Sequence, residues 1–267
     1  MGVTTGAGQA GIDAMGLAIN WTVRAPESAS AESVMGSVRA WREACLDLPF
    51  DAVTELVSFD AAEIARRLED RADPFRWFLV QASASLPINP ADPDEGWVSV
   101  DPIAIVGFTA FAGKECEPMN CFLARYPEKA VVGLHVVRPE ISDWRGSSFA
   151  KTQYASTVTA QHFLKCHLTI TAALDAAKAA GLLESVMDES GYWDDRDAQE
   201  LLTTVGRWNA MIAAFVGGLE LATGETLPAK IKQHPEFERL EFLGTTAETA
   251  AMAKAIAEAI KRSEPEK

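Results

Sequence analysis

Residues 144–154, with the sequence WRGSSFAKTQY, gather chemically versatile side chains into one short stretch. The stretch combines hydroxyls, an amide, two cations and three aromatic rings, whereas its flanks are mostly aliphatic. Convergent polar groups beside aromatic rings are typical of small-molecule pockets. We therefore expect a ligand-binding loop here. Its binding side chains are Trp144, Arg145, Ser147, Ser148, Gln153 and Tyr154.

The charge of this region favours an anionic ligand. Residues 138–165 contain four Lys or Arg against two acids, whereas the whole chain has a net charge of −14. Hydroxyls and a glycine just before a helix can present N–H donors and the helix dipole to a phosphate or carboxylate group. Arg145 and Lys151 would hold that group. The alternative is a structural segment whose aromatic rings fill the core while its polar groups cap the next helix.

Three side chains could move protons if the site is enzymatic. Lys151 lies inside the stretch, and His162 follows within two turns of a predicted helix, with a side chain that titrates near neutral pH. Asp194 belongs to a second polar segment, in which Tyr192 and Trp193 could form an aromatic wall for a ligand. Capping explains most acids at the start of a helix, however. The two segments would meet only if the helices that follow them pack antiparallel.

Two motifs lack the context that their chemistry needs. Ser148 and Lys151 fit S-x-x-K, a spacing that in penicillin-recognising enzymes places both on one helical turn, but no K-T-G follows. Residues 6–11 fit the dinucleotide pattern G-x-G-x-x-G, but only five residues precede them, too few for the strand that aims the glycines. We therefore expect a flexible leader there and no nucleotide cofactor.

A zinc site is the chemistry that the cysteines could offer. Cys116, Cys121, His162 and Cys166 supply the ligand types of a Cys3His centre. The first two are five apart, which on a strand places them on opposite faces. Cys166 lies in an apolar helical pattern, where a cysteine behaves as a small hydrophobe. We expect no metal.

Composition limits the class of protein. The chain is 48% hydrophobic and 23% charged, as in globular proteins. A net charge of −14 disfavours nucleic acid and anionic membranes as partners. No run reaches the roughly eighteen apolar residues that span a bilayer. Four scattered cysteines indicate a reduced, cytoplasmic protein rather than a disulfide scaffold.

Hydrophobic periodicity predicts an α+β fold. We expect a mainly antiparallel sheet of about five strands, with helices packed chiefly on one face. The chain should form a single domain over residues 1–267, with a flexible leader at 1–12 and a frayed tail at 263–267. The predicted helices cover about 34–48, 60–71, 157–180, 195–220 and 245–260, and the predicted strands are 15–23, 76–83, 98–111, 120–125 and 130–138.

In the first helix, Val34, Val38, Trp41, Cys45 and Leu48 share one apolar stripe. Asp60 with Glu63 should form a capping box, and Asp194 or Asp195 should cap the helix that follows. His167 should be buried and hydrogen-bonded.

Two function classes remain open. The first is a small-molecule site at the 144–154 loop, with or without catalysis. The second is a non-enzymatic interaction or assembly protein that uses exposed tryptophans such as Trp144 and Trp193 as anchors. The sequence leaves the oligomeric state undetermined. An enclosed pocket would support the first class, and a flat apolar patch with outward tryptophans would support the second.

Overall fold

A computed structural model describes residues 17–263, apart from the side chains of Pro93, Ile260, Lys261 and Ser263. The predicted leader, with its glycine motif at 6–11, lies outside the described residues, as do residues 264–267 of the predicted tail. Within residues 17–263, no helix combines the length and the apolar character that crossing a bilayer requires.

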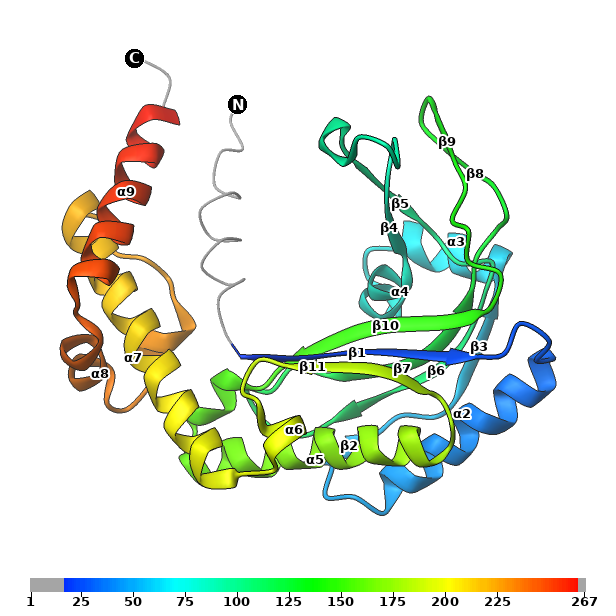
Figure 1. Ribbon diagram of the computed structural model, residues 1–267, viewed down its shortest axis with the longest axis horizontal. Coiled ribbons are helices and arrows are strands. Elements are labelled where there is room, and N and C mark those ends of the chain that lie inside the picture. The colour runs from blue at the N-terminus through cyan, green and yellow to red at the C-terminus, as the bar shows by residue number, and fades with distance from the viewer. Residues whose placement is uncertain (1–16, 264–267) are drawn as a thin grey trace.

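The central element is an antiparallel sheet, which confirms the predicted α+β class (Figure 1). Its strands follow the order β11-β1-β10-β7-β6-β2, and β3 also pairs with β6. The strand bounds are β1 Ala18–Ala25, β2 Ala52–Val53, β3 Val57–Asp60, β6 Ala104–Phe111, β7 Met119–Arg125, β10 Trp144–Lys151 and β11 Leu183–Asp188. Alternate side chains of each strand face opposite sides, so the sheet needs a separate cover on each face.

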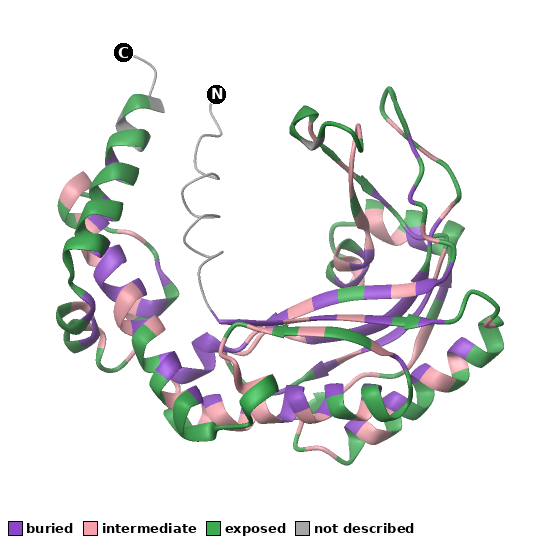
Figure 2. Cartoon of the chain, viewed as in Figure 1, coloured by how far each residue is buried: buried purple, intermediate pink, exposed green. Residues whose placement is uncertain are grey.

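Helices α2 (Ala31–Leu46) and α5 (Ala160–Ala179) cover one face of the sheet and form the largest core with it. The predicted stripe of α2 is confirmed, since Val34, Val38, Trp41 and Cys45 are all buried. The Trp41 indole Nε1 donates to the Ala173 carbonyl at 2.8 Å, which joins the two helices. Figure 2 shows the buried residues along the strands and on the sides of these helices that face them.

A smaller core covers part of the opposite face, beneath α3 (Ala61–Glu69) and α4 (Arg76–Ala82). The capping box predicted for Asp60 and Glu63 is present and begins α3. The strand predicted at 76–83 is wrong, because this segment forms α4. Its buried residues Phe78, Leu79 and Ala82 have helical spacing, and short apolar runs fit either structure.

Two hairpins project from this side of the molecule (Figure 1). The first joins β4 (Ala84–Pro87) to β5 (Trp97–Val100) through a turn that contains η1 (Pro93–Glu95). The second joins β8 (Ala130–Val132) to β9 (His135–Val137), so the single strand predicted at 130–138 is a hairpin. Gly133 takes a positive φ of 60° in its turn, a conformation that favours glycine.

The C-terminal helices form a third core at the other end of the molecule. Helix α7 (Ala198–Thr223) starts against the sheet core and ends in this third core. Asp197, rather than the predicted Asp194 or Asp195, caps α7 by accepting from the amides of Gln199 and Glu200. The remaining elements are η2 Gln153–Thr157, α6 Tyr192–Asp195, η3 Lys230–Gln233, α8 Phe237–Gly244 and α9 Ala247–Ser263.

Candidate functional site

The 144–154 stretch forms strand β10 and the start of η2 rather than a loop, and β10 lies between β1 and β7 in the sheet. Alternation places Arg145, Ser147 and Phe149 on one side of the strand. Their partners across the antiparallel register are Arg24, Thr22 and Asn20 of β1. We call this side of β1, β10 and β11 the open face, because α2 and α5 pack on the other side.

A pocket of about 350 Å³ lies on the open face. The Thr22 and Ser147 hydroxyls are 3.3 Å apart across its floor, so one can donate to the other. Its lining residues are Asn20, Trp21, Thr22, Ser147, Ser148, Phe149, Ser185 and Met187. The pocket therefore combines hydroxyl groups with a few apolar side chains, and two of the predicted binding residues, Ser147 and Ser148, belong to it.

Arg145 lies on the same face but is engaged by acids. Its Nη2 is 3.4 Å from Asp143 and 3.5 Å from Glu184. Arg24 contacts the same two carboxylates, at 3.5 Å and 3.0 Å. The Glu184 carboxylate, which Arg24 hydrogen-bonds, raises the pKa of Arg24. Two cations and two anions thus balance one another, and an anionic ligand would have to compete with Asp143 and Glu184.

Ser148 and Lys151 do not form the helical pair that the S-x-x-K spacing suggests. They lie three residues apart on a strand, and their side chains therefore point to opposite faces. The Ser148 hydroxyl donates to Gln81 of α4 at 3.3 Å. The Lys151 backbone amide donates to Glu117 at 3.0 Å. We therefore assign no Ser/Lys catalytic pair.

Trp144 and Gln153 serve the interior. Trp144 is buried in the sheet core, so the expectation of an exposed tryptophan anchor at this position is wrong. Gln153 is fully buried, and its Oε1 accepts from the Leu17 amide at 2.9 Å. Its Nε2 donates to Asn209 of α7, also at 2.9 Å. Both ends of this amide are occupied within the protein.

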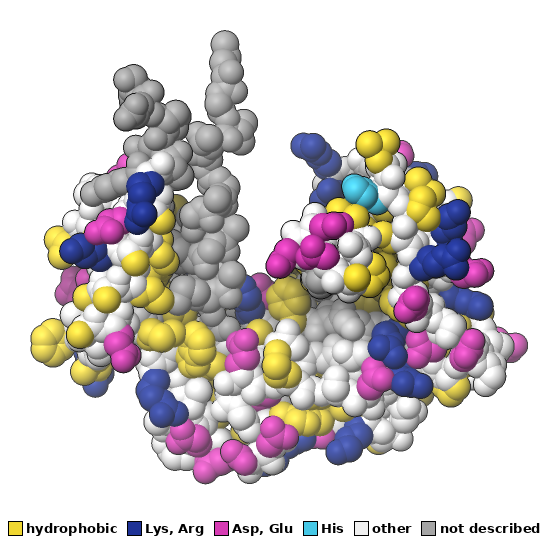
Figure 3. All heavy atoms as spheres, turned by 45° about the horizontal axis from the view of Figure 1, so that its top comes forward, with side chains coloured by type: hydrophobic (Ala, Val, Ile, Leu, Met, Phe, Trp, Pro, Cys, Tyr) yellow, Lys and Arg dark blue, Asp and Glu magenta, His cyan; other side chains and the backbone are white. Residues whose placement is uncertain are grey.

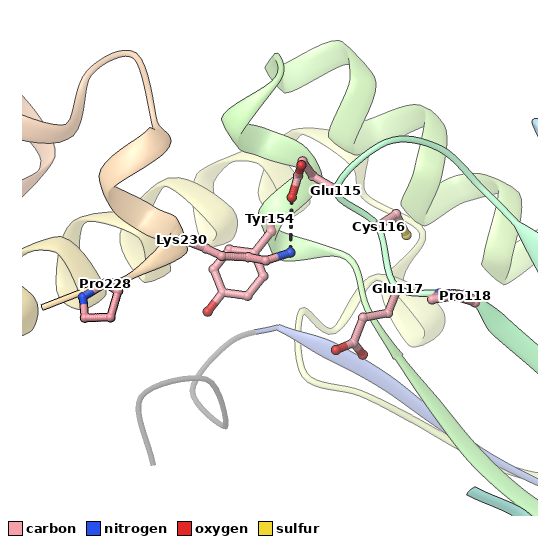
Figure 4. A pocket seen from close by; sticks show the side chains of 7 residues that line it. All are labelled: Glu115, Cys116, Glu117, Pro118, Tyr154, Pro228 and Lys230. Atoms are coloured by element: carbon pink, nitrogen blue, oxygen red, sulfur yellow. Dashed lines mark hydrogen bonds and ion pairs between the residues drawn. The ribbon is translucent and has the colours of Figure 1, made fainter. Parts of the chain in front are cut away.

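Tyr154 lines a second pocket, of about 620 Å³, next to the sheet (Figure 4). Lys230 lies over the Tyr154 ring, 5.7 Å from its centroid, and its Nζ binds Glu115 at 3.1 Å. The other lining residues are Cys116, Glu117, Pro118 and Pro228. This pocket lies between the β6–β7 connection and the segment that links α7 to α8.

Tyr192, Trp193 and Asp194 lie on the helix-covered side of the sheet, away from Ser147. The Tyr192 ring packs edge-on against His167 of α5 with centroids 5.8 Å apart. Trp193 packs against the sheet core, and Asp194 is exposed. The structure therefore does not bring this segment together with the open-face pocket.

The rest of that segment is attached to α5. Arg196 binds Asp175 with two nitrogens, at 2.8 Å and 2.9 Å, and lies over the Trp193 ring. This arrangement is a structural anchor for α6. His162 lies elsewhere on α5, where its Nε2 is 2.8 Å from the Lys114 carbonyl.

His167 lies at the centre of a buried polar network. It was expected to be buried and hydrogen-bonded, and this is confirmed. Its Nδ1 is 2.9 Å from the Thr152 hydroxyl and its Nε2 is 3.0 Å from Asp188 Oδ2. Burial alone would raise the pKa of Asp188, but hydrogen bonds from His167 and Ser190 lower it overall. These partners are distant in sequence, so no local pattern could reveal them.

All four cysteines belong to the sheet core or pack against it. Cys45, Cys121 and Cys166 are buried there, and Cys116 is partly buried against it. Residues 17–263 contain no group of three or more His, Cys, Asp or Glu side chains arranged to hold a metal ion.

Large apolar side chains are exposed on the two hairpins. We call these four the hairpin surface: Trp97 at 59%, Val131 at 70%, Leu134 at 99% and Val136 at 56% exposure. Val131 and Val136 are direct cross-strand partners, and β5 contacts β8. In Figure 3, hydrophobic side chains lie among acidic and basic ones on the lobe that the hairpins form. Trp97 follows an acidic turn, which is the only sequence signal that could have indicated its exposure.

Comparison with protein-family models, with curated proteins and with solved structures found no match.

Proposed function

We propose that this protein is a non-enzymatic binding protein whose hairpin surface docks onto a basic protein partner. The exposure of Trp97, Leu134 and the Val131–Val136 pair carries the proposal. Large apolar side chains grouped on a surface typically mark a site of protein contact. Tryptophan is also among the residues that contribute most binding energy at such contacts.

The charge of the β4–β5 hairpin, which carries Trp97 at one side of the hairpin surface, supports a basic partner. No Lys or Arg occurs from residue 77 to residue 113, whereas this segment contains Asp92, Asp94, Glu95 and Asp101. The three acids of the β4–β5 turn are exposed. Complementary charge speeds association and disfavours partners of the same sign. A partner with an apolar centre and a basic rim would fit.

A Trp97→Ala/Leu134→Ser double variant tests the proposal. The partner would be captured with the wild-type protein from the cells that naturally produce it, identified by mass spectrometry and then purified. Isothermal titration of that partner should give an affinity at least about 30-fold weaker for the double variant, because losing a binding hot spot costs about 2 kcal/mol. Both side chains are exposed, so folding should be preserved.

Leu221→Ser is the matched control, because Leu221 is 89% exposed on α7, outside the hairpins. It should change the affinity by no more than about twofold. Added salt should slow association with the wild type, since salt screens exposed charges. Unchanged affinity of the double variant, or a partner with an acidic binding surface, would contradict the proposal.

A small-molecule site on the open face is a second proposal. Its support is the 350 Å³ pocket in which Thr22, Ser147 and Ser185 adjoin Phe149, near Arg145 on the same strand. Phosphate, sulfate and citrate would be screened by thermal shift. We expect an anion to raise the wild-type Tm and Arg145→Ala to abolish that rise, whereas Arg39→Ala, an exposed change on α2, should retain it. If no anion stabilises the wild type, this second proposal fails.

A further inference from the structure

Strand β11 forms one edge of the sheet, and its outer side has no strand partner among residues 17–263 (Figure 1). Its inner side pairs with β1. The strands at the opposite edge are shorter, because β2 has two residues and β3 has four. With six residues, β11 therefore offers the longest free edge strand of this sheet.

The register with β1 shows which backbone groups of β11 face outward. Glu189, directly after the strand, donates its amide to the Ala18 carbonyl at 3.2 Å and so marks a hydrogen-bonded pair. Such pairs alternate with unbonded pairs along an antiparallel ladder. Met187 is therefore bonded to β1, whereas Asp188 and Val186 belong to unbonded pairs. It follows that Val186 directs both its N–H group and its C=O group away from β1.

The exposure of β11 agrees with a free edge. None of its six residues is buried (Figure 2). The side chain of Asp188 is 0% exposed, yet the residue as a whole is partly exposed, so its exposed part is the backbone. Met187 is 62% exposed and lines the pocket on the open face. An added strand would therefore find open backbone groups with an apolar side chain beside them.

The charge at the C-terminal end of β11 favours a basic segment. Residues 184–200 contain seven Asp or Glu and one Arg. Glu189 and Asp195 are exposed. The Asp195 carboxylate lies 3.9 Å from the position of a methyl group added at Gly191, which places it just beyond the strand. The acids at the other end of β11 are balanced by arginines. A Lys or Arg of an added strand would therefore find its complement near Asp195.

We propose that the outer edge of β11 binds an extended, basic segment of a partner protein by strand addition. Hydrogen bonds between the backbone of the segment and Val186 supply the affinity, as in other complexes of this kind. A β-branched or aromatic side chain of the segment packs beside Met187, because cross-strand neighbours contact one another. A basic side chain further along lies near Asp195. The proposal does not depend on a partner for the hairpin surface.

A random heptapeptide library displayed on phage is the probe, and the full-length Trp97→Ala/Leu134→Ser variant is the bait, which avoids peptides that bind the hairpin surface. The selected peptides should contain alternating β-branched or aromatic residues together with Lys or Arg. Synthetic copies of them should bind the wild-type protein in isothermal titration. Asp195→Asn should weaken this binding about threefold, since an exposed ion pair is lost.

Val186→Pro tests the backbone contact. Proline removes the outward N–H group, so the peptides should bind at least about tenfold more weakly. Proline is tolerated on an edge strand where the lost N–H group faces outward. Val186→Ala is the matched control, because both variants lose side-chain packing on the sheet core but only alanine keeps the N–H group. The control should change the affinity by no more than about threefold.

Amide hydrogen exchange measured by NMR gives a second readout on the wild-type protein. In the free protein, the Val186 amide should exchange faster than the Met187 amide, which is bonded to β1. A bound peptide should slow the exchange of Val186 by at least about tenfold, and by more than that of Met187.

The proposal is overturned if no library peptide binds, if the selected peptides bind Val186→Pro as tightly as the wild type, or if the exchange of the Val186 amide is unchanged in the complex. It is also overturned if the wild-type protein is a dimer in which the Val186 amide is protected without peptide. The edge would then pair with a second copy of this chain.

Discussion

At the scale of single residues, the His167 imidazole fixes three segments relative to one another. It joins α5 to Thr152 before η2 and to Asp188 at the end of β11. The Asp188 carboxylate also accepts from Ser190 and from the Trp193 amide. A buried polar group left without a partner costs about 1–3 kcal/mol, so the network favours the one arrangement that pairs all of its groups. This arrangement holds β11, one border of the open face.

Asp188→Asn should destabilise the protein by about 2 kcal/mol at neutral pH, because an amide nitrogen would face donors that the carboxylate now accepts from. Chemical denaturation monitored by circular dichroism measures this change. Glu225→Gln, an exposed change, is the control and should have almost no effect.

The same variant should alter the acid limb of the stability curve. Asp188 has a folded-state pKa below its ordinary value of 3.8. A lowered pKa contributes stability that is complete above the unfolded-state pKa and is lost as the pH falls through the folded-state pKa. The wild type should therefore lose stability more steeply than Asp188→Asn below about pH 4. Parallel curves would show that Asp188 contributes nothing to the acid sensitivity.

At the scale of elements, close strand contact determines where β10 can lie. A side chain at Gly146 would collide with the Phe122 carbonyl of β7. Glycine is therefore required there by the neighbouring backbone. The same strand also carries most of the predicted ligand residues. The position of β10 therefore decides which of them line the pocket on the open face and which enter the core.

Gly146→Ala should lower the free energy of unfolding by about 3 kcal/mol, because overpacking forces the two strands apart. Gly36→Ala is the matched control. Gly36 is exposed on α2 with no atom near the added methyl group, so this change should stabilise the protein by about 0.5–1 kcal/mol. Urea titration measures the free energy of unfolding of both variants. Equal changes in the free energy of unfolding for the two variants would contradict the predicted collision with the Phe122 carbonyl.

At the scale of the whole molecule, α7 joins two separate cores. Leu201 and Val205 belong to the sheet core, whereas Ile212 and Phe215 belong to the C-terminal core. Trp208 lies between them and packs against both. Gln153 and Asn209 add a buried polar link between η2 and α7. The C-terminal helices therefore depend on α7 for their placement.

Trp208→Ala should loosen the C-terminal helices before the sheet. We expect faster hydrogen exchange in α8 and α9, with protection of α5 unchanged, because the removed ring supports the junction of the cores. Trp77→Ala, which removes an indole that is 57% exposed on α4, is the control and should leave exchange in α8 and α9 unchanged. A uniform increase in hydrogen exchange across the whole chain would contradict the expectation that the C-terminal core loosens before the sheet core.

Part of the candidate site could be predicted from the sequence, and part could not. Residues 144–154 were identified as unusual, and Ser147 and Ser148 do line a pocket. Their composition could not show that Gln153 bonds to Asn209, 56 residues away, or that Arg145 meets Glu184. The sequence also predicts an exposed tryptophan at Trp144, which is buried, whereas Trp77 and Trp97 are exposed. Burial depends on which segments pack together, and composition does not record that.

The sequence alone determined the features that depend on near neighbours in the chain. The Asp60–Glu63 capping box and the buried stripe of α2 follow from hydrogen bonds and spacings within a few residues. Only the tertiary structure decided that 76–83 is a helix, because an apolar segment of that length takes the form that its packing partners stabilise. It also decided that the turn at Gly113 packs on Cys166 and that the apolar hairpins face outward, since contacts between distant segments depend on the sheet that brings them together.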